Sequence, residues 1–355
     1  MGNHRLAAIV ACSLLALSVA VRAQGSEPAP RIPLVVGLTT IRAVAETLGD
    51  YESIRSTTVV GNAGYSFRNH AEVPDGPGGA TREINVLRSV PIADHLHARA
   101  MRNRFNVGDA EVFPGTTPGV SADIVNELRS SGSAAMSYID ARQMFGIAAE
   151  HSLKGSVKRI GTSAEDFAVI VNGRRTIVRV LHAKGRMAGS GREDEIEFQV
   201  LDDPDNPLMM SASGPGFKSR ITRIDYPLPA GNAASMESKL AANEPVDVYG
   251  IYFAFGSDRL RPESDRVLKE VAELLGRHRD WKLQIDGHTD SIGGDSANLD
   301  LSRRRAAAVK AALVQRYAIA TKRFSSGGFG ESRPKDRNDT IEGRALNRRV
   351  ELRRL

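Results

Sequence analysis

The segment DGHTDSIGGDSANLDLSRRRAAAVKAAL, residues 286–313, changes from strand-like to helical character within a few residues. It begins at the end of an apolar alternation, passes through Gly293-Gly294, and continues with apolar residues three or four positions apart. The apolar stripe of this predicted helix consists of Leu301, Ala308, Val309, Ala312 and Leu313. Arg305 lies four residues after Leu301 and four before Val309. The spacing therefore predicts a cation on the core-facing side of the helix.

An arginine in that position needs an anion or other hydrogen-bond partners, because burying an unpaired charge costs several kcal/mol. Asp290, at the predicted strand end, is a candidate partner. The two residues form either an internal ion pair or a pair of contacts for the ammonium and carboxylate of a zwitterionic ligand. Asn298 lies on nearly the same helical face as Arg305, whereas Arg303 and Arg304 fall outside the stripe and are expected to face solvent.

Strand-like and helical patterns alternate from Val246 to the C-terminus. The expected elements are a strand at 246–255, a helix at 262–278, a strand at 281–286, the long helix to about 317, a strand near 323–330, a helical turn at 342–349 and a final strand. The helix at 262–278 begins with a proline in its first turn and carries an apolar face. This order predicts a separate domain in which helices pack on one sheet.

Four blocks in this region resemble the OmpA-like C-terminal domain, a family of peptidoglycan-binding modules. They are YFAFGSDRLRPES, GHTDSIGGDSANLDLSRRRAAAV, GFGESRP and EGRALNRRVEL, and the resemblance covers about residues 246–355. It implies a β/α/β/α-β sandwich and places the protein in the cell envelope of Gram-negative bacteria. One departure is Ala254, which follows Phe253 where many members have an aspartate.

The same resemblance implies a ligand site. Asp290 and Arg305 match the family positions that hold diaminopimelate of the peptidoglycan stem peptide. Four further positions match residues that line the pocket: Thr289, Asn298, Leu301 and Arg348. No catalytic residue and no cofactor is implied.

Residues 33–226 have a β-rich pattern, so the whole chain is expected to be of the α+β class. Strand-like runs flank Asn172-Gly173 within 167–183, which predicts a tight hairpin, and 195–201 alternates as another strand. A short helix is expected at 121–131 with Ser121 as its cap. Aromatic residues make up only 5% of the chain and the strand signals are irregular, which favours a soluble periplasmic domain over an outer-membrane barrel. Residues 227–245 form a predicted linker with a short helix.

The N-terminus has the pattern of a secretory signal peptide, residues 1–23. Arg5 precedes an apolar run of sixteen residues, too short for the roughly 20 that a membrane span needs, and cleavage is expected after Ala23. The alternative is a lipoprotein, because IVAC resembles a lipid-attachment box ending at Cys12. The mature protein is expected in the periplasm, associated with the cell wall and the outer membrane.

The charge distribution and the histidines constrain the function less than the sequence motifs do. From Val246 onward there are 22 Lys+Arg against 16 Asp+Glu, a basic excess that fits an anionic partner. Nucleic acid is not expected, because a secreted chain rarely meets it and no aromatic platform interrupts the basic C-terminus. His95 and His97 could share a strand face, but two ligands make a weak metal site, so no metal is predicted. His288 is expected to be structural, since no nucleophile motif accompanies it.

Three functions for the chain remain open. The first is a non-enzymatic anchor that binds peptidoglycan through 246–355. The second is a cell-wall hydrolase whose paired carboxylates would lie in 33–226. Asp202, Asp203 and Asp205 are close in sequence, but they are better explained as a turn. The third makes 33–226 a docking module for another envelope protein.

Residues 246–355 should fold on their own, because their expected strands and helices close a core without upstream residues. The segment expressed alone should show one cooperative thermal transition by circular dichroism. A gradual, non-cooperative melt would contradict the boundary at Val246.

Overall fold

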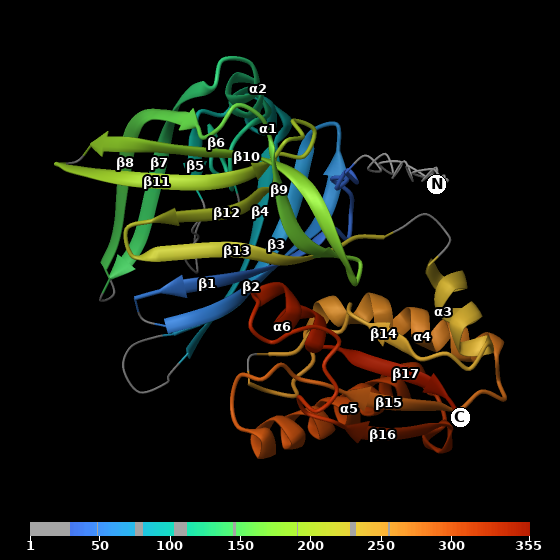
Figure 1. The fold of residues 1–355 in the computed structure, drawn as a ribbon. Coiled ribbons are helices and arrows are strands. Elements are labelled where there is room, and N and C mark those ends of the chain that lie inside the picture. Colours follow the sequence, from blue (N-terminus) through green and yellow to red (C-terminus); the bar gives the residue numbers. More distant parts are fainter. Residues whose placement is uncertain are drawn as a thin grey trace, which may run out of the picture.

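The computed structural model describes residues 29–355 except 48, 75–80, 103–111, 145–146, 190, 228–231 and 255. The predicted signal peptide, and Cys12 with it, lies outside the described residues. The described chain has two sheets, a large N-terminal one and a small C-terminal one covered by helices (Figure 1). The α+β class expected from the sequence is therefore confirmed.

Most strand pairs of the N-terminal region join antiparallel sequence neighbours, and the others are parallel or join strands that are not consecutive in the chain. The strands are β1 (Thr39–Glu46), β2 (Gly49–Gly61), β3 (Gly64–Pro74), β4 (Thr81–Pro91), β5 (Ala100–Arg102), β6 (Thr116–Thr117), β7 (Ser133–Met144), β8 (Ile147–Arg159), β9 (Glu165–Val171), β10 (Arg174–Gly189), β11 (Arg192–Leu201), β12 (Met209–Gly214) and β13 (Phe217–Asp225). Their order is β4-β3-β2-β1-β13-β12-β11-β10-β8-β7-β5-β6. Strand β9 pairs with both β10 and β13, so five strands close on themselves around an apolar core.

Local sequence explains the turns and helices of this region. Asn172 and Gly173 have φ angles of 46° and 77°, the conformation of the tight turn expected between β9 and β10. Helix α2 (Ala122–Ser130) begins after Ser121, whose side chain accepts a hydrogen bond from the backbone N–H of Ile124. Both predictions are confirmed. Residues 92–97 form helix α1 (Ile92–His97) and not the strand that was considered for His95 and His97.

The C-terminal sheet has the order β14-β17-β15-β16, with β15 and β16 parallel and the other pairs antiparallel. Its elements are α3 (Asn232–Ala241), β14 (Val246–Val248), the 3-10 turn η1 (Pro262–Ser264), α4 (Asp265–Arg277), β15 (Leu283–Gly287), α5 (Asp295–Tyr317), the 3-10 turn η2 (Thr321–Arg323), β16 (Phe324–Gly328), α6 (Ile341–Asn347) and β17 (Val350–Arg354). Apolar residues of α4, α5 and the sheet form one core.

The strand expected at 246–255 is wrong in length, because β14 ends at Val248. Gly250 lies so close to Val267 of α4 that a side chain on it would overlap this valine. The chain then leaves the sheet, and the hydroxyl of Tyr252 donates to Asp225 of β13 at 2.6 Å. The predicted strand is thus interrupted by packing on one helix and by contact with the other sheet.

The predicted stripe of α5 is also shifted. Its buried residues are Asn298, Ser302, Ala306, Val309, Ala312 and Leu313, so Leu301 and Ala308 lie at the edge of the buried face. The reason is a close approach of the helix to two glycines, Gly287 of β15 and Gly328 of β16. A small residue, Ser302, lies at this approach, and Arg305 lies at the border of the buried face, where it is half-buried.

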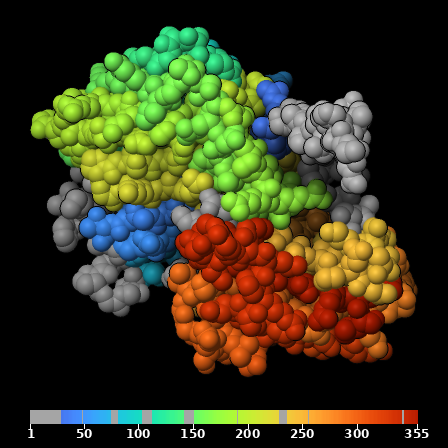
Figure 2. All heavy atoms as spheres, viewed as in Figure 1, coloured from blue at the N-terminus to red at the C-terminus, as the bar shows by residue number. Residues whose placement is uncertain are grey.

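The N-terminal and C-terminal parts of the chain lie against each other (Figure 2). Their contact combines paired polar groups with a small apolar cluster. Ile41 and Ile54 pack against Tyr252. Arg261 of the C-terminal domain lies 2.6 Å from Nε2 of His70 and 3.5 Å from Glu72 on β3. Helix α6 packs against β9 and β13.

Replacing Gly287 with alanine should destabilise the protein, because the new methyl group would overlap the main-chain oxygen of Ser302 in α5. We expect a loss of about 1–3 kcal/mol in the free energy of unfolding, measured by urea denaturation. Gly276→Ala in α4 is the matched control, since nothing lies within 4 Å of its added carbon. It should be neutral or stabilising. Equal stability of the two variants would contradict the close approach.

Candidate ligand-binding site

A cavity of about 610 Å³ lies between the two sheets. On the C-terminal side it is lined by all six residues expected in the ligand site: Thr289, Asp290, Asn298, Leu301, Arg305 and Arg348. They come from the loop after β15, from α5 and from the end of α6. On the N-terminal side it is lined by β1, β2 and β13. The volume is in the range of ordinary ligand pockets, about 300–1,000 Å³.

Asp290 is fixed at the start of the loop that follows β15. Its Oδ1 accepts a hydrogen bond from the backbone N–H of Ile292 at 3.0 Å. Its Oδ2 accepts one from Nη1 of Arg348 at 2.6 Å. Arg348, and not Arg305, is therefore the ion-pair partner of Asp290 in the structure.

Arg305 has no carboxylate within 4.0 Å in the part of the chain that the structure describes. Its Nε donates to the main-chain oxygen of Ser257 at 2.9 Å, and its guanidinium lies 4.9 Å from the ring centre of Phe253. Burial lowers the pKa of Arg305 to about 10, and Arg348 acts in the same direction against the carboxylates of Glu52 and Asp290. The side chain thus stays protonated near neutral pH and leaves both Nη groups for another acceptor.

The other expected residues differ in what they contribute. The amide Nδ2 of Asn298 donates to the main-chain oxygen of Asp290 at 3.2 Å and to Glu331 at 2.7 Å, so it holds the loop. Thr289 is 4% exposed, and its hydroxyl has no hydrogen-bond partner among the described residues. Leu301 is half-buried and supplies apolar lining. Arg303 and Arg304 are exposed, as expected.

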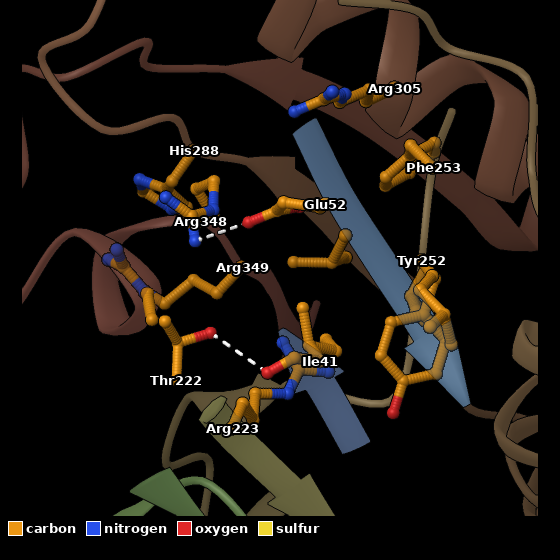
Figure 3. A pocket seen from close by; sticks show the side chains of 14 residues that line it. Ile41, Glu52, Thr222, Arg223, Tyr252, Phe253, His288, Arg305, Arg348 and Arg349 are labelled. Atoms are coloured by element: carbon orange, nitrogen blue, oxygen red, sulfur yellow. Dashed lines mark hydrogen bonds and ion pairs between the residues drawn. The ribbon is translucent and has the colours of Figure 1, made fainter. Parts of the chain in front are cut away.

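Glu52 of β2 is a site residue that the sequence did not reveal. Its Oε1 accepts from Nη2 of Arg348 at 2.8 Å, across 296 positions of sequence. Figure 3 shows a second pocket, which shares Glu52, Phe253, Arg305 and Arg348 with the cavity. Glu52 is directed toward Arg348 there, and Arg305 lies on another side of this pocket. Burial alone would lower the pKa of Arg348, but Glu52 and Asp290 outweigh it and raise this pKa. No local pattern around Glu52 could have predicted the contact, because sheet packing creates it.

His288 lies behind the site and is 3% exposed. Its ring stacks on Phe329 with centroids 5.4 Å apart, and neither ring nitrogen has a hydrogen-bond partner among the described residues. Burial, with a contribution from Arg349, lowers the pKa of His288 to about 4. A neutral, stacked imidazole fits the structural role expected of it.

The basic C-terminal segment is largely neutralised by carboxylates of its own domain. Arg349 pairs with Asp247 at 2.9 Å, and Arg353 pairs with Asp286 at 2.9 Å. The first pair ties Arg349 to the edge strand β14, and the second joins the neighbouring central strands β17 and β15.

The two histidines considered as metal ligands in the N-terminal region, His95 and His97, do not form a common site in the described residues. His95 is buried on α1, with Nε2 3.2 Å from the main-chain oxygen of Asp205, whereas His97 is exposed and pairs with Asp123. Two positions apart on a helix, the histidines point away from each other, so the shared strand face is wrong. No group of three or more His, Cys, Asp or Glu that could hold a metal occurs in the described chain.

The acidic segment 202–205 forms a turn, as expected. Asp202 pairs with Arg129, and Asp203 pairs with Arg31. These carboxylates are thus engaged by arginines. Among the described helices, none is long and apolar enough to cross a membrane.

Comparison with known proteins identifies the family of the C-terminal domain. Residues 252–348 match the OmpA family, so the C-terminal part of the chain is an OmpA-family domain. The chain is 41% identical over 101 residues to outer membrane porin F of Pseudomonas aeruginosa, a match that covers 28% of this chain and 29% of the porin. It is 37% identical over 128 residues to peptidoglycan-binding protein ArfA of Mycobacterium bovis, covering 36% of this chain and 37% of that protein.

Among solved structures, the peptidoglycan-associated lipoprotein of Burkholderia pseudomallei is 28% identical. The overlay covers 30% of this chain and 88% of that one, with a TM-score of 0.28. The chain spans less than a third of the length of porin F, so the likeness concerns one domain and not the whole protein.

Stability should fall as the pH is lowered from about 6.5 to 4, because His288 binds a proton more readily in the unfolded chain, near pKa 6.5, than in the folded one. The unfolded state then carries more protons, so acid favours it, by up to roughly 3 kcal/mol. His288→Phe keeps the stack on Phe329 and should flatten this dependence in thermal melts across that range. Identical slopes for the variant and the parent would contradict the assignment.

Proposed function

We propose that the protein binds peptidoglycan non-covalently through the diaminopimelate of the stem peptide. The OmpA-family domain is the binding module, and it anchors the N-terminal region to the cell wall. The cavity offers Asp290 for the ligand ammonium and Arg305 for its carboxylate, contacts that are charge-assisted and directional. Its place would be the periplasm, at the cell wall beneath the outer membrane. No cofactor enters this proposal.

One observation carries the proposal. Arg305 is half-buried at a cavity wall, keeps its charge, and lacks a carboxylate partner in the described chain. A desolvated cation without a counter-ion costs free energy, so a ligand carboxylate at this point gains more than it would at an exposed arginine. The relative named as a peptidoglycan-binding protein supports peptidoglycan, though not diaminopimelate in particular, as the ligand.

Ala254 does not remove the site. Its side chain is buried, its backbone N–H donates to the main-chain oxygen of Arg259 at 2.9 Å, and it lines the cavity. If the family aspartate contributes through its side chain, affinity is lower here. If the backbone contributes, the turn keeps that contribution.

The hydrolase alternative gains no support from the described N-terminal region. Asp202, Asp203 and Asp205, the acids considered for it, are each paired with an arginine. Retaining and inverting glycosidases need two free carboxylates across a cleft. We therefore propose a non-enzymatic role for the chain, with an envelope protein as a further partner of the N-terminal region.

Asp290→Ala and Arg305→Ala should each weaken co-sedimentation with purified diaminopimelate-containing sacculi by roughly tenfold to a hundredfold, since each charge-assisted contact is worth about 1.5–3 kcal/mol. The folded fraction of each variant should remain close to that of the parent. Binding isotherms at constant ionic strength provide the measurement.

Arg303→Ala is the control, because Arg303 is exposed on the same helix, two residues away from Arg305. It should bind almost normally. A folded Asp290→Ala protein with full affinity for sacculi would refute the proposed site. A drop in binding that merely follows a lower melting temperature would indicate a structural role instead.

A further inference from the structure

The N-terminal sheet forms one wall of the cavity that the ligand enters. Strand β1 contributes the small residues Ala43 and Ala45, β2 contributes Glu52, and β13 contributes Lys218. Almost half of the lining residues belong to this wall. The peptidoglycan site of the full chain therefore differs from that of a lone OmpA-family domain.

Glu52 changes the charge at the ammonium end of the site. Without it, Asp290 and Arg348 would form a neutral pair at 2.6 Å, and Arg348 would compete with a ligand ammonium for the aspartate. Because Nη2 of Arg348 also pairs with Glu52 at 2.8 Å, the three groups carry a net charge of −1. Arg348 divides its charge between two carboxylates, and each remains a better acceptor.

Arg305 supplies the opposite charge in the same cavity. The three-group cluster of Asp290, Arg348 and Glu52 carries the negative charge, and Arg305 carries the positive charge that no carboxylate within 4.0 Å in the described chain neutralises. The side chains of Asp290, Arg348 and Glu52 are 12%, 29% and 39% exposed, so water screens them only in part. Such a dipolar arrangement complements a zwitterion. The cavity is also lined by Asp50, Lys218, Arg220 and Arg344, so the preference for an ammonium rests on the cluster around Asp290 and not on the overall charge of the lining.

We propose that Glu52 is a specificity-determining residue of the ligand site, and that it selects for the free ammonium group of the zwitterionic stem-peptide residue. This inference rests on the proposed function. Through Glu52, the N-terminal region would take a direct part in recognising the ligand. Glu52 acts in part through Arg348, which it shares with Asp290.

The test uses the full chain and two soluble stem peptides in calorimetric titrations. One peptide ends in meso-diaminopimelate, and the other has the same sequence with the terminal ammonium replaced by hydrogen. Glu52→Gln should bind the first peptide about tenfold more weakly and the second peptide as the parent protein does. A purely structural contribution of Glu52 would weaken both peptides equally.

Glu72→Gln is the matched control. Glu72 also lies on the N-terminal sheet and pairs across the same interface, with Arg259 and Arg261, but away from the cavity. Glu72→Gln should bind both peptides as the parent protein does. If it does, a weakened contact between the two domains cannot explain the weaker binding by Glu52→Gln. Thermal melts of both variants check that each is folded.

Unchanged or tighter binding of the diaminopimelate peptide by folded Glu52→Gln would overturn the inference. Tighter binding would mean that Glu52 competes with the ligand carboxylate for Arg348. Absence of binding by the parent protein would instead refute the proposed function, and the inference with it. The parent titration therefore distinguishes the two failures.

Discussion

Arg348 links the two halves of this protein and the ligand cavity between them. It caps the C-terminal end of α6, and its two terminal nitrogens pair with Asp290 at 2.6 Å and with Glu52 at 2.8 Å. One carboxylate belongs to the loop after β15 and the other to β2 of the opposite sheet. A partly buried guanidinium must keep its anions, because leaving it unpaired is costly. The position of the N-terminal sheet and the geometry of the site thus depend on the same side chain.

The close packing of α5 on the sheet fixes the other end of the site. Gly287 and Gly328 allow the helix to approach until Ser302 lies against them. The hydroxyl of Ser302 also accepts a hydrogen bond from the backbone N–H of Gly330 at 2.8 Å, which ties the loop after β16 to the helix. With Ser302 against the two glycines, the longer Arg305 lies beside Phe253 at the border of the core. Its half-buried, charged state follows from this packing.

The N-terminal sheet stabilises cations in a different way. Arg42 is held by Ser219 and by a main-chain oxygen, and burial lowers its pKa to about 9. Arg55 stacks 4.5 Å from the ring centre of Phe67. Arginines on inward-facing positions weaken the apolar alternation by which a strand is recognised. This explains why the sequence indicated only a few of the strands that the structure contains between Thr39 and Asp225.

The sequence by itself determined the elements whose signals are local. It predicted the hairpin at Asn172-Gly173, the cap at Ser121, the order of strands and helices after Val246, and an arginine in α5 near the core. Turn chemistry, capping and helical period act within a few residues, so a linear pattern contains them. The tertiary structure alone decided that Asp290 pairs with Arg348, that the strand at Val246 ends early, and that Glu52 enters the cavity. These outcomes depend on contacts between segments up to 296 positions apart, where packing and charge pairing between two sheets, rather than local preference, set the free energy.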